Sequence, residues 1–190
     1  MIHACTEGWA AGLRLLAVLL KQAGGNLDKT LTDLRRQDTD LYTYLGNELL
    51  AYLPGELHAF LLDASLLPYL ESALCDNALS WCDSEALIVQ LHAHGILSKT
   101  EGDVTTWRLH HLMGEFLEQK VKKLRPPEHA ASIRRRAAVF LESQGDIDRA
   151  LEQLAANADW SGMAAIINRH GDDYFLQCGR LDALRSWLGH

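Results

Sequence analysis

The chain has 190 residues, of which 48% are hydrophobic, and its 18 basic and 25 acidic residues give a net charge of −7 at pH 7. This is the composition of an ordinary globular protein with enough apolar residues for a core. The longest apolar stretch, AAGLRLLAVLL, is too short to span a bilayer, no secretory leader is evident and the four cysteines show no CxxC spacing, so we expect a cytoplasmic protein without membrane contacts.

The first 53 residues read as helices. The Thr6 hydroxyl can cap a helix that ends at the glycine pair of residues 24–25. A short helix over 27–36 follows. The next helix, over 41–53, carries one apolar stripe at steps of four residues. Its members are Leu41, Leu45, Leu49 and Leu53.

Two prolines divide the following stretch into two further helices. Proline is tolerated in the first turn of a helix, so Pro54 and Pro68 each predict a helix start, for helices over 54–67 and 69–79. The first of these helices has an apolar face that we expect to point inward. It consists of Leu57, Phe60 and Leu61.

A third helix and a hairpin are predicted next. Asp83 is an N-cap for a helix over 84–94, and Gly95 suits the left-handed conformation that ends such a helix. Two short strands, over 96–100 and 104–109, flank a Glu-Gly-Asp turn, which is typical of a β-hairpin.

The order of these elements is that of a winged helix. A further helix from His111 to about Leu124 closes the unit, and two adjacent prolines at 126–127 mark the clearest boundary in the chain. We therefore assign residues 38–125 to a winged-helix domain with a short β-hairpin.

Everything beyond this boundary reads as helix. We expect helices over 129–144, 146–158, 160–178 and 181–188. The GDID of residues 145–148 recurs as GRLD at 179–182, an offset of 34 residues, which is the period of tetratricopeptide-type (TPR-like) antiparallel helix pairs. Such units need about three copies to be stable, so we expect residues 126–190 to be the start of a longer array.

No complete catalytic or metal motif is present. The sequence lacks a P-loop (GxxxxGK[ST]), GxGxxG, HExxH and GxSxG, so we expect no enzymatic activity and no cofactor in this chain. His92 and His94 are two apart on a helix and point in nearly opposite directions, so they cannot chelate one ion together. Cys75 and Cys82 would need distant partners to hold zinc. We predict no metal site.

Charge argues against DNA recognition by the winged helix. Residues 38–119 contain thirteen acidic and two basic residues, and the third helix, 84–94, contains neither Lys nor Arg. DNA affinity comes largely from neutralising phosphates, so we expect no direct nucleic acid binding by this segment. One basic cluster follows; it consists of Lys120, Lys122, Lys123, Arg125, Arg134, Arg135 and Arg136. We expect these residues to be solvated or packed against the acidic winged helix, with an acidic partner or nucleotide phosphates as the alternative.

Four stretches, TEGWAAGLRLLA, YLGNELLAYLPGELHAFLLDASLL, EALIVQLHAHGIL and WRLHHLMGEFL, resemble consecutive landmarks of the MalT-like LuxR-family transcriptional regulators, which are signal-transduction ATPases of the STAND class. The resemblance covers nearly the whole chain. It implies that residues 1–37 end the helical subdomain of an ATPase core, that 38–125 are the winged helix and that 126–190 begin the TPR-like repeats. The implied partners are the missing ATPase core, the remaining repeats and a small-molecule inducer.

The resemblance also gives a role to the histidine pair. In the wider class a histidine at the strand-to-helix junction of the winged helix reaches the β-phosphate of bound ADP. Leu109-His110-His111 matches that motif, so His110 would sense nucleotide in the intact parent protein, where ATP and ADP are the ligands. Gly8 and Trp9 match a Gly-x-Pro landmark beside the adenine, although Ala10 replaces its proline. Without a P-loop, we expect neither ATP hydrolysis nor tight ADP binding by this chain alone.

These observations predict a mainly α-helical, non-catalytic central segment of an ATP-dependent LuxR-type regulator. The winged helix would couple nucleotide state to inducer sensing without itself reading DNA. Two alternatives remain open, a free-standing TPR-like protein-interaction adaptor and a winged-helix DNA-binding protein.

Overall fold

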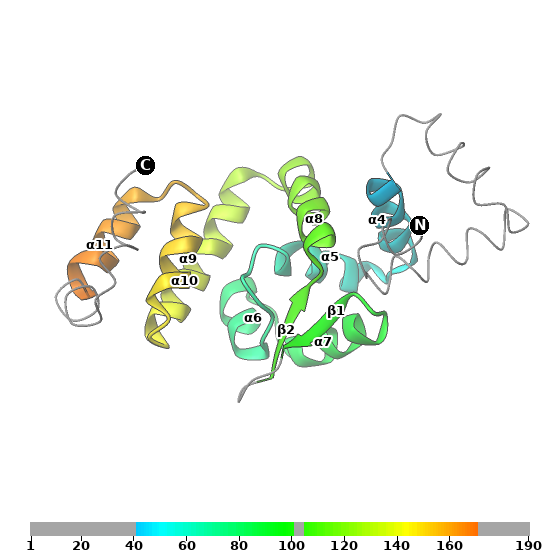
Figure 1. Ribbon diagram of the computed structural model, residues 1–190, viewed down its shortest axis with the longest axis horizontal. Helices are drawn as coiled ribbons and strands as arrows, with labels where there is room; N and C mark the ends of the chain where they lie inside the picture. Colours follow the sequence, from blue (N-terminus) through cyan, green and yellow to red (C-terminus); the bar gives the residue numbers. More distant parts are fainter. Residues whose placement is uncertain (1–40, 101–104, 171–190) are drawn as a thin grey trace, which may run out of the picture.

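The computed structural model of the protein describes residues 41–100 and 105–170 (Figure 1). The predictions for residues 1–40, including Gly8 and Trp9, and those for the hairpin turn and the last twenty residues lie outside the described part. The elements are α4 (Leu41–Tyr52), α5 (Gly55–Ala64), α6 (Ser72–Leu79), α7 (Ser84–Ala93), β1 (Leu97–Thr100), β2 (Thr106–Leu109), α8 (His111–Leu124), α9 (Pro127–Ser143), α10 (Ile147–Ala155) and α11 (Trp160–His170).

Over the described residues the fold is mainly helical with one two-stranded antiparallel sheet, as predicted. Helix α5 lies at the centre of the winged helix and contacts α6, α7 and α8. All three predicted inward residues of α5 are fully buried; they are Leu57, Phe60 and Leu61. Of the stripe predicted for α4, Leu49 and Leu53 are buried.

Helix α4 packs closely on α8. A Cβ atom built on Gly46 would lie 2.6 Å from Cε1 of Phe116, so only glycine fits this position as the structure stands. The Phe116 side chain is itself buried. This contact fixes the position of α4 against the helix that follows the strand-to-helix junction.

The hairpin is extended by a short third segment. The strands pair in antiparallel register from Leu97 opposite Leu109 to Thr100 opposite Thr106. Leu70 forms an additional antiparallel bridge with Trp107, through backbone hydrogen bonds of 2.8 and 2.9 Å. The sequence placed residues 69–71 in a helix, and this is wrong because the backbone of Leu70 pairs with the sheet, so α6 begins only at Ser72.

Helix α7 begins at Ser84 as predicted and ends at Ala93, one residue before the predicted end, but its N-cap differs. Asp83 occupies the N-cap position in a left-handed conformation, with φ of 62°, and its side chain makes no capping hydrogen bond. The Ser84 N–H instead donates to Oδ1 of Asp76, at 3.1 Å. Gly95 has φ of 74° and ends the helix in the left-handed conformation, as expected.

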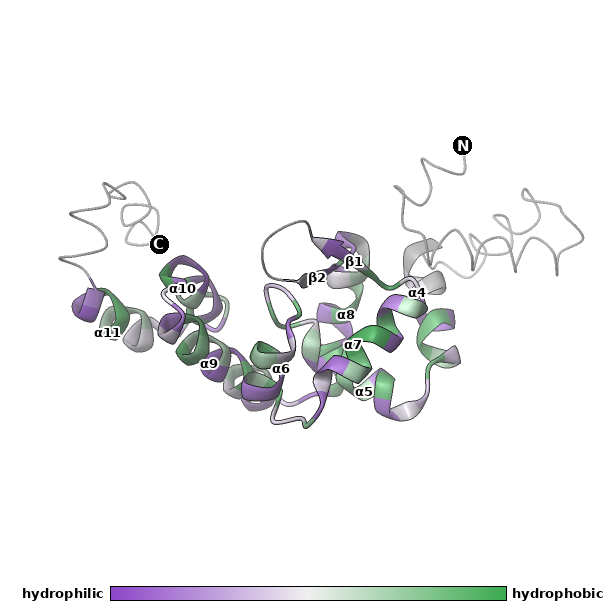
Figure 2. Ribbon diagram, turned by 90° about the horizontal axis from the view of Figure 1, so that it is seen from below, coloured by the Kyte–Doolittle hydropathy of each residue, from purple (hydrophilic) through white to green (hydrophobic). Residues whose placement is uncertain are grey.

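Helices α9 and α10 form a helical hairpin that packs directly on the winged helix. Helix α9 contacts α6 on one side and α10 on the other, and α10 contacts α11. Along α9 the colouring of Figure 2 alternates between hydrophobic and hydrophilic residues. Its buried residues, such as Ile133 and Ala137, belong to the same core cluster as Leu74 and Ala78 of α6. The core therefore runs uninterrupted past the two prolines.

The turn between α9 and α10 follows its predicted chemistry. Gly145 has φ of 79°, and Asp146 caps α10 by accepting a hydrogen bond from the Arg149 N–H at 3.3 Å. The copy of this motif at 179–182 lies outside the described residues. In the part of the chain that the structure describes, no helix is both long and apolar enough to cross a membrane.

Candidate functional site

The histidine pair lies at the junction of β2 and α8, where the sequence placed it. His110 is the N-cap residue of α8, with extended φ and ψ of −61° and 138°, and its carbonyl accepts a hydrogen bond from the Gly114 N–H at 2.9 Å. The ring centroids of His110 and His111 lie 4.5 Å apart, and the ring planes are tilted by 33° to each other. His110 is half-buried and His111 is exposed. The junction therefore presents two adjacent imidazoles at the start of a helix.

Among the described residues, His92 and the two cysteines belong to no group that could hold a metal ion. Nδ1 of His92 donates to the Leu97 carbonyl at 3.2 Å, and the centroid of the His92 ring lies 4.5 Å from that of Trp107. Cys75 is buried, which raises the pKa of its thiol to about 12, whereas Cys82 is exposed. Among residues 41–100 and 105–170, no group of three or more His, Cys, Asp or Glu side chains could hold a metal ion.

A buried carboxylate organises the turn between α8 and α9. Asp63, at the end of α5, accepts a hydrogen bond from Nε2 of His129 at 3.0 Å and lies 3.3 Å from Nε of Arg125. The Asp63 side chain is 10% exposed, and those of Arg125 and His129 are 32% and 38% exposed. This cluster joins the central helix of the winged helix to both ends of the α8–α9 turn.

A second carboxylate links α8 to α9 along the same edge. Oε1 of Glu118 lies 3.4 Å from Nζ of Lys122 and 3.5 Å from Nη2 of Arg134. Burial lowers the pKa of the Arg134 guanidinium, and Glu118 partly opposes that effect. One carboxylate oxygen of Glu118 therefore pairs with both Lys122 and Arg134.

Two further contacts join α9 and α10 to the winged helix. Arg136 donates from Nε to the Ala78 carbonyl at 2.7 Å, which satisfies an acceptor near the end of α6. The guanidinium of Arg149 on α10 lies 5.2 Å from the ring centroid of Tyr69, before α6. These contacts and the shared core attach α9 and α10 to the winged helix at several separate points.

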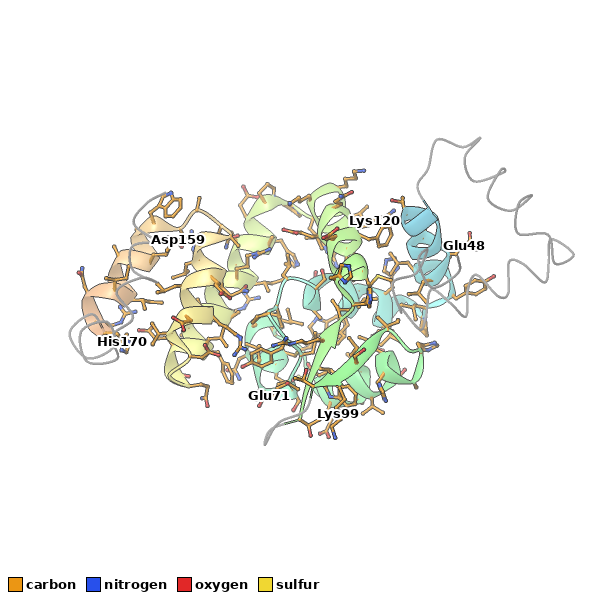
Figure 3. The ribbon with its side chains drawn as sticks, in the orientation of Figure 1. Glu48, Glu71, Lys99, Lys120, Asp159 and His170 are labelled. Atoms are coloured by element: carbon orange, nitrogen blue, oxygen red, sulfur yellow. The ribbon has the colours of Figure 1, made fainter. Side chains whose placement is uncertain are left out.

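Ion pairs also hold α9 and α11 at both ends. Arg135 donates to Asp159 at 2.6 Å, and this hydrogen bond, with those from Gly162 and Ser161, lowers the pKa of the Asp159 carboxyl to about 2. At the other end Arg169 donates twice to the Glu142 carboxylate, which lowers the pKa of Glu142. Figure 3 places Asp159 and His170 at opposite ends of α11.

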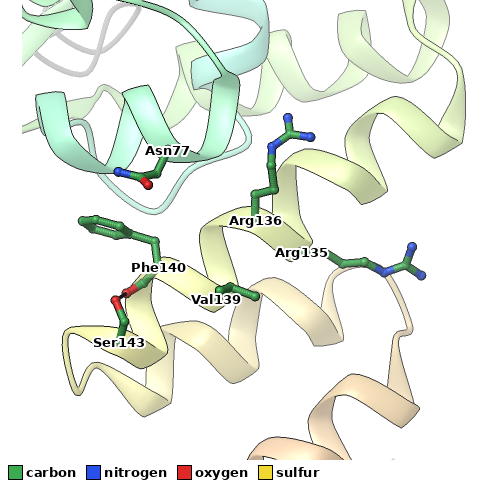
Figure 4. A pocket seen from close by; sticks show the side chains of 6 residues that line it. All are labelled: Asn77, Arg135, Arg136, Val139, Phe140 and Ser143. Carbon is green, nitrogen blue, oxygen red and sulfur yellow. Dashed lines mark hydrogen bonds between the residues drawn. The ribbon is translucent and has the colours of Figure 1, made fainter.

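An open cavity of about 370 Å³ lies beside α9 (Figure 4). It is lined by Asn77, Arg135, Arg136, Val139, Phe140 and Ser143. In Figure 4 Phe140 extends toward Asn77 on α6, whereas Arg135 and Val139 point to the other side of α9. Since both arginines already have protein acceptors, this cavity offers mainly apolar surface.

The basic cluster is thus largely paired with the protein itself. Its arginines contact Asp63, Glu118, Asp159 and the Ala78 carbonyl, and Lys120 lies over the Phe116 ring at 5.5 Å. Arg125, Arg134 and Arg136 therefore pack against the winged helix as expected, whereas Arg135 pairs with Asp159, beyond that domain. The sequence did not identify the individual acceptors. Only the excess of acidic residues in 38–119 indicated that acceptors would be nearby.

Comparisons with known proteins agree with this geometry. Residues 46–130 match the family model of the MalT winged helix domain. The chain is 28% identical over 183 residues to the HTH-type transcriptional regulator MalT of Vibrio cholerae, which covers 95% of this chain and 20% of that protein. It is also 28% identical over 155 residues to the serine/threonine-protein kinase PknK of Mycobacterium tuberculosis, covering 81% of this chain and 14% of the kinase. The chain spans about a fifth or less of these relatives.

Proposed function

We propose that this segment is the non-catalytic coupling element of an ATP-dependent transcriptional regulator. The proposal starts from the match of residues 46–130 to the MalT winged helix domain family and from the similarity of the chain to MalT regulators. It would pass the nucleotide state of an ATPase core, on one side, to inducer-sensing TPR-like repeats on the other. The observation that carries the proposal is the continuous core between the winged helix and α9. Because protein cores are close-packed, a displacement of the winged helix would be transmitted through α6 to α9 and α10.

The comparisons support a role separate from the output of the whole protein. Similar segments occur in relatives named as a transcriptional regulator and as a protein kinase. A region common to two proteins with such different names is a better candidate for signal transmission than for DNA binding or kinase catalysis. We therefore place DNA binding and catalysis of the parent outside this segment, and we expect the parent to work in the cytoplasm.

The His110 imidazole is the proposed nucleotide sensor. It lies at the start of α8, and an imidazole N–H can donate to a phosphate oxygen when the ATPase core brings ADP or ATP to this junction. Helix α8 leads from this residue directly to the α8–α9 turn, so loss of the phosphate contact would change the position of α8 and, through this turn, of the repeats. A nucleotide shifts the equilibrium between two domain arrangements only by the difference in its affinity for them.

We further propose that the winged helix does not read DNA. Helix α7, which would enter a major groove, carries Glu85 in its first turn and neither Lys nor Arg. A gel-retardation assay of this chain with random-sequence duplex DNA at low salt should show no complex. A complex whose affinity falls steeply with salt would contradict this proposal.

The coupling proposal is tested in a regulator that carries this segment beside its ATPase core. Spin labels at Glu56 on α5 and Ser143 on α9 should keep one distance in ADP and ATP, while distances from Glu56 to the core should change. A change of several ångströms between the two labels would refute the rigid-body role.

A paired substitution tests the functional consequence. Arg136→Met removes the hydrogen bond to the Ala78 carbonyl, and we expect it to weaken inducer-dependent transcription while leaving ADP affinity unchanged. Arg108→Met, on the exposed side of β2, is the matched control with the same charge change. Equal effects of the two substitutions would contradict transmission through the α6–α9 contact.

A further inference from the structure

A cleft at the α8–α9 turn holds more positive than negative charge. It has a volume of about 240 Å³ and extends to the residues just before α11. Its polar lining consists of Glu118, Lys122, Arg125, Arg134 and Asn157. Three cations thus face one carboxylate. The remaining lining is apolar and includes Val121 and the two prolines of the turn.

The carboxylates near this cleft are shared, so the positive charge is incompletely balanced. Both Lys122 and Arg134 contact the same oxygen of Glu118, at 3.4 and 3.5 Å. Arg125 depends on Asp63, which also accepts a hydrogen bond from His129. An added anion would meet cations that are already held in place by these contacts.

Arg134 is the residue best suited to receive that anion. Its side chain is only 12% exposed, so its charge lies largely out of water, and its contact with Glu118 runs through Nη2. A guanidinium offers five N–H donors in a planar fork, which matches the oxygens of a carboxylate or phosphate. Charge-assisted hydrogen bonds of this kind are stronger than those between neutral groups.

Recognition would come from side chains and not from the end of α9. Helices often bind anions through free N–H groups at their first turn. Here α9 starts after Pro126 and at Pro127, and proline has no N–H. Asn157 completes the polar side of the cleft, because its Nδ2 donates to the Ala131 carbonyl at 3.1 Å and is thereby fixed in place.

We propose that this cleft binds a small organic oxyanion, with its carboxylate or phosphate group on Arg134 and Lys122 and a short apolar body against Val121 and the prolines. The volume lies below the range of roughly 300 to 1,000 Å³ that drug-sized ligands occupy, so the ligand is smaller than these. A ligand here touches both α8 and α9 and therefore stabilises their relative position. This inference goes beyond the coupling role, because binding requires neither nucleotide nor the ATPase core.

The experiment titrates the 190-residue chain with inorganic phosphate and, separately, with succinate, at constant ionic strength balanced by chloride. The side-chain amide of Asn157 and the Nε–H of Arg134 are followed by nitrogen-15 NMR. We expect saturable shifts confined to the cleft. Saturation by either anion supports the site and identifies the preferred group, whereas no saturable shift with either anion overturns it.

Three substitutions locate the binding. Arg134→Met should weaken binding by about tenfold or more. Lys122→Gln, at a side chain that is 70% exposed and not needed for folding, should weaken it by about threefold. Lys99→Gln makes the same charge change on β1, outside the cleft, and should leave binding unchanged. Equal weakening by Lys122→Gln and Lys99→Gln would show a response to net charge alone and would also overturn the proposal.

Discussion

Replacing Asp63 by asparagine tests how strongly the α8–α9 turn is attached to the winged helix. The substitution keeps the shape of the side chain but removes the charge that faces Arg125 and His129. A hydrogen bond to a charged group is worth about 1.5 to 3 kcal/mol, and breaking a fully buried ion pair costs about 3 to 5 kcal/mol. Both partners are about one-third exposed, so the cost lies near the lower range, at about 2 kcal/mol.

One smaller effect opposes this loss. Asp63 lies in the last turn of α5, where the helix dipole disfavours a negative charge by about 0.3 to 1 kcal/mol, so neutralising it recovers part of the cost. We therefore expect Asp63→Asn to lower the free energy of unfolding by about 1.5 kcal/mol. For a protein of this size that corresponds to a fall in Tm of about 3 to 6 °C.

The assay is urea unfolding at pH 7, followed by circular dichroism. Glu56→Gln, at an exposed acid in the first turn of the same helix, is the control and should cost no more than about 0.5 kcal/mol. Combining Asp63→Asn with Arg125→Gln should show a coupling of about 1 kcal/mol. If Asp63→Asn costs no more than the control, the cluster contributes no net stability and our account of the turn is wrong.

Two further predictions concern close packing and pH. Gly46→Ala should lower the free energy of unfolding by about 1 to 2 kcal/mol, because the new Cβ would meet the Phe116 ring. Gly114→Ala, which has open space in α8, should raise it by about 0.5 to 1 kcal/mol. Equal effects of the two substitutions in urea unfolding would refute the close contact. The pKa of Asp159 in the folded protein, about 2, is below its ordinary value of 3.8, so its ion pair stabilises the fold above about pH 4 and this stability is lost as the pH falls toward 2. A carbon-13 NMR titration should show that pKa, and Arg135→Gln should raise it toward 3.8; a pKa unchanged by the substitution would contradict the assigned cause.

The elements that the sequence predicted well are those bounded by strong local signals. Helix α7 lies between the Asp83 cap position and the left-handed Gly95, and the hairpin strands were placed within two residues. Local rules failed where a distant segment competes. Leu70 follows a proline in a helical pattern, yet its backbone pairs with Trp107, a residue 37 positions later in the chain. No periodicity within residues 69–79 reports that partner.

The candidate site shows the same division. His110 was placed at the strand-to-helix junction because a change from alternating to helical periodicity is visible in the sequence. The contact between Asp63 and His129 joins residues 66 positions apart, and that between Arg136 and the Ala78 carbonyl joins residues 58 positions apart. Arg134 and Glu118 are closer in the chain but lie on two different helices. Charge sums gave the sign of these interactions, but pairing of individual side chains depends on helix packing that the sequence does not display.

The uninterrupted core past Pro126 limits how such a gene can be recombined. An exchange with its breakpoint at these prolines would leave the buried faces of α6 and α9 uncovered in the two products, with Leu74 and Ile133 facing water. Exposed faces of this kind promote aggregation, so selection would remove most such chimeras. Viable breakpoints should fall outside the winged helix and the α9–α10 hairpin. The winged helix and this hairpin should therefore be exchanged together, as one evolutionary unit.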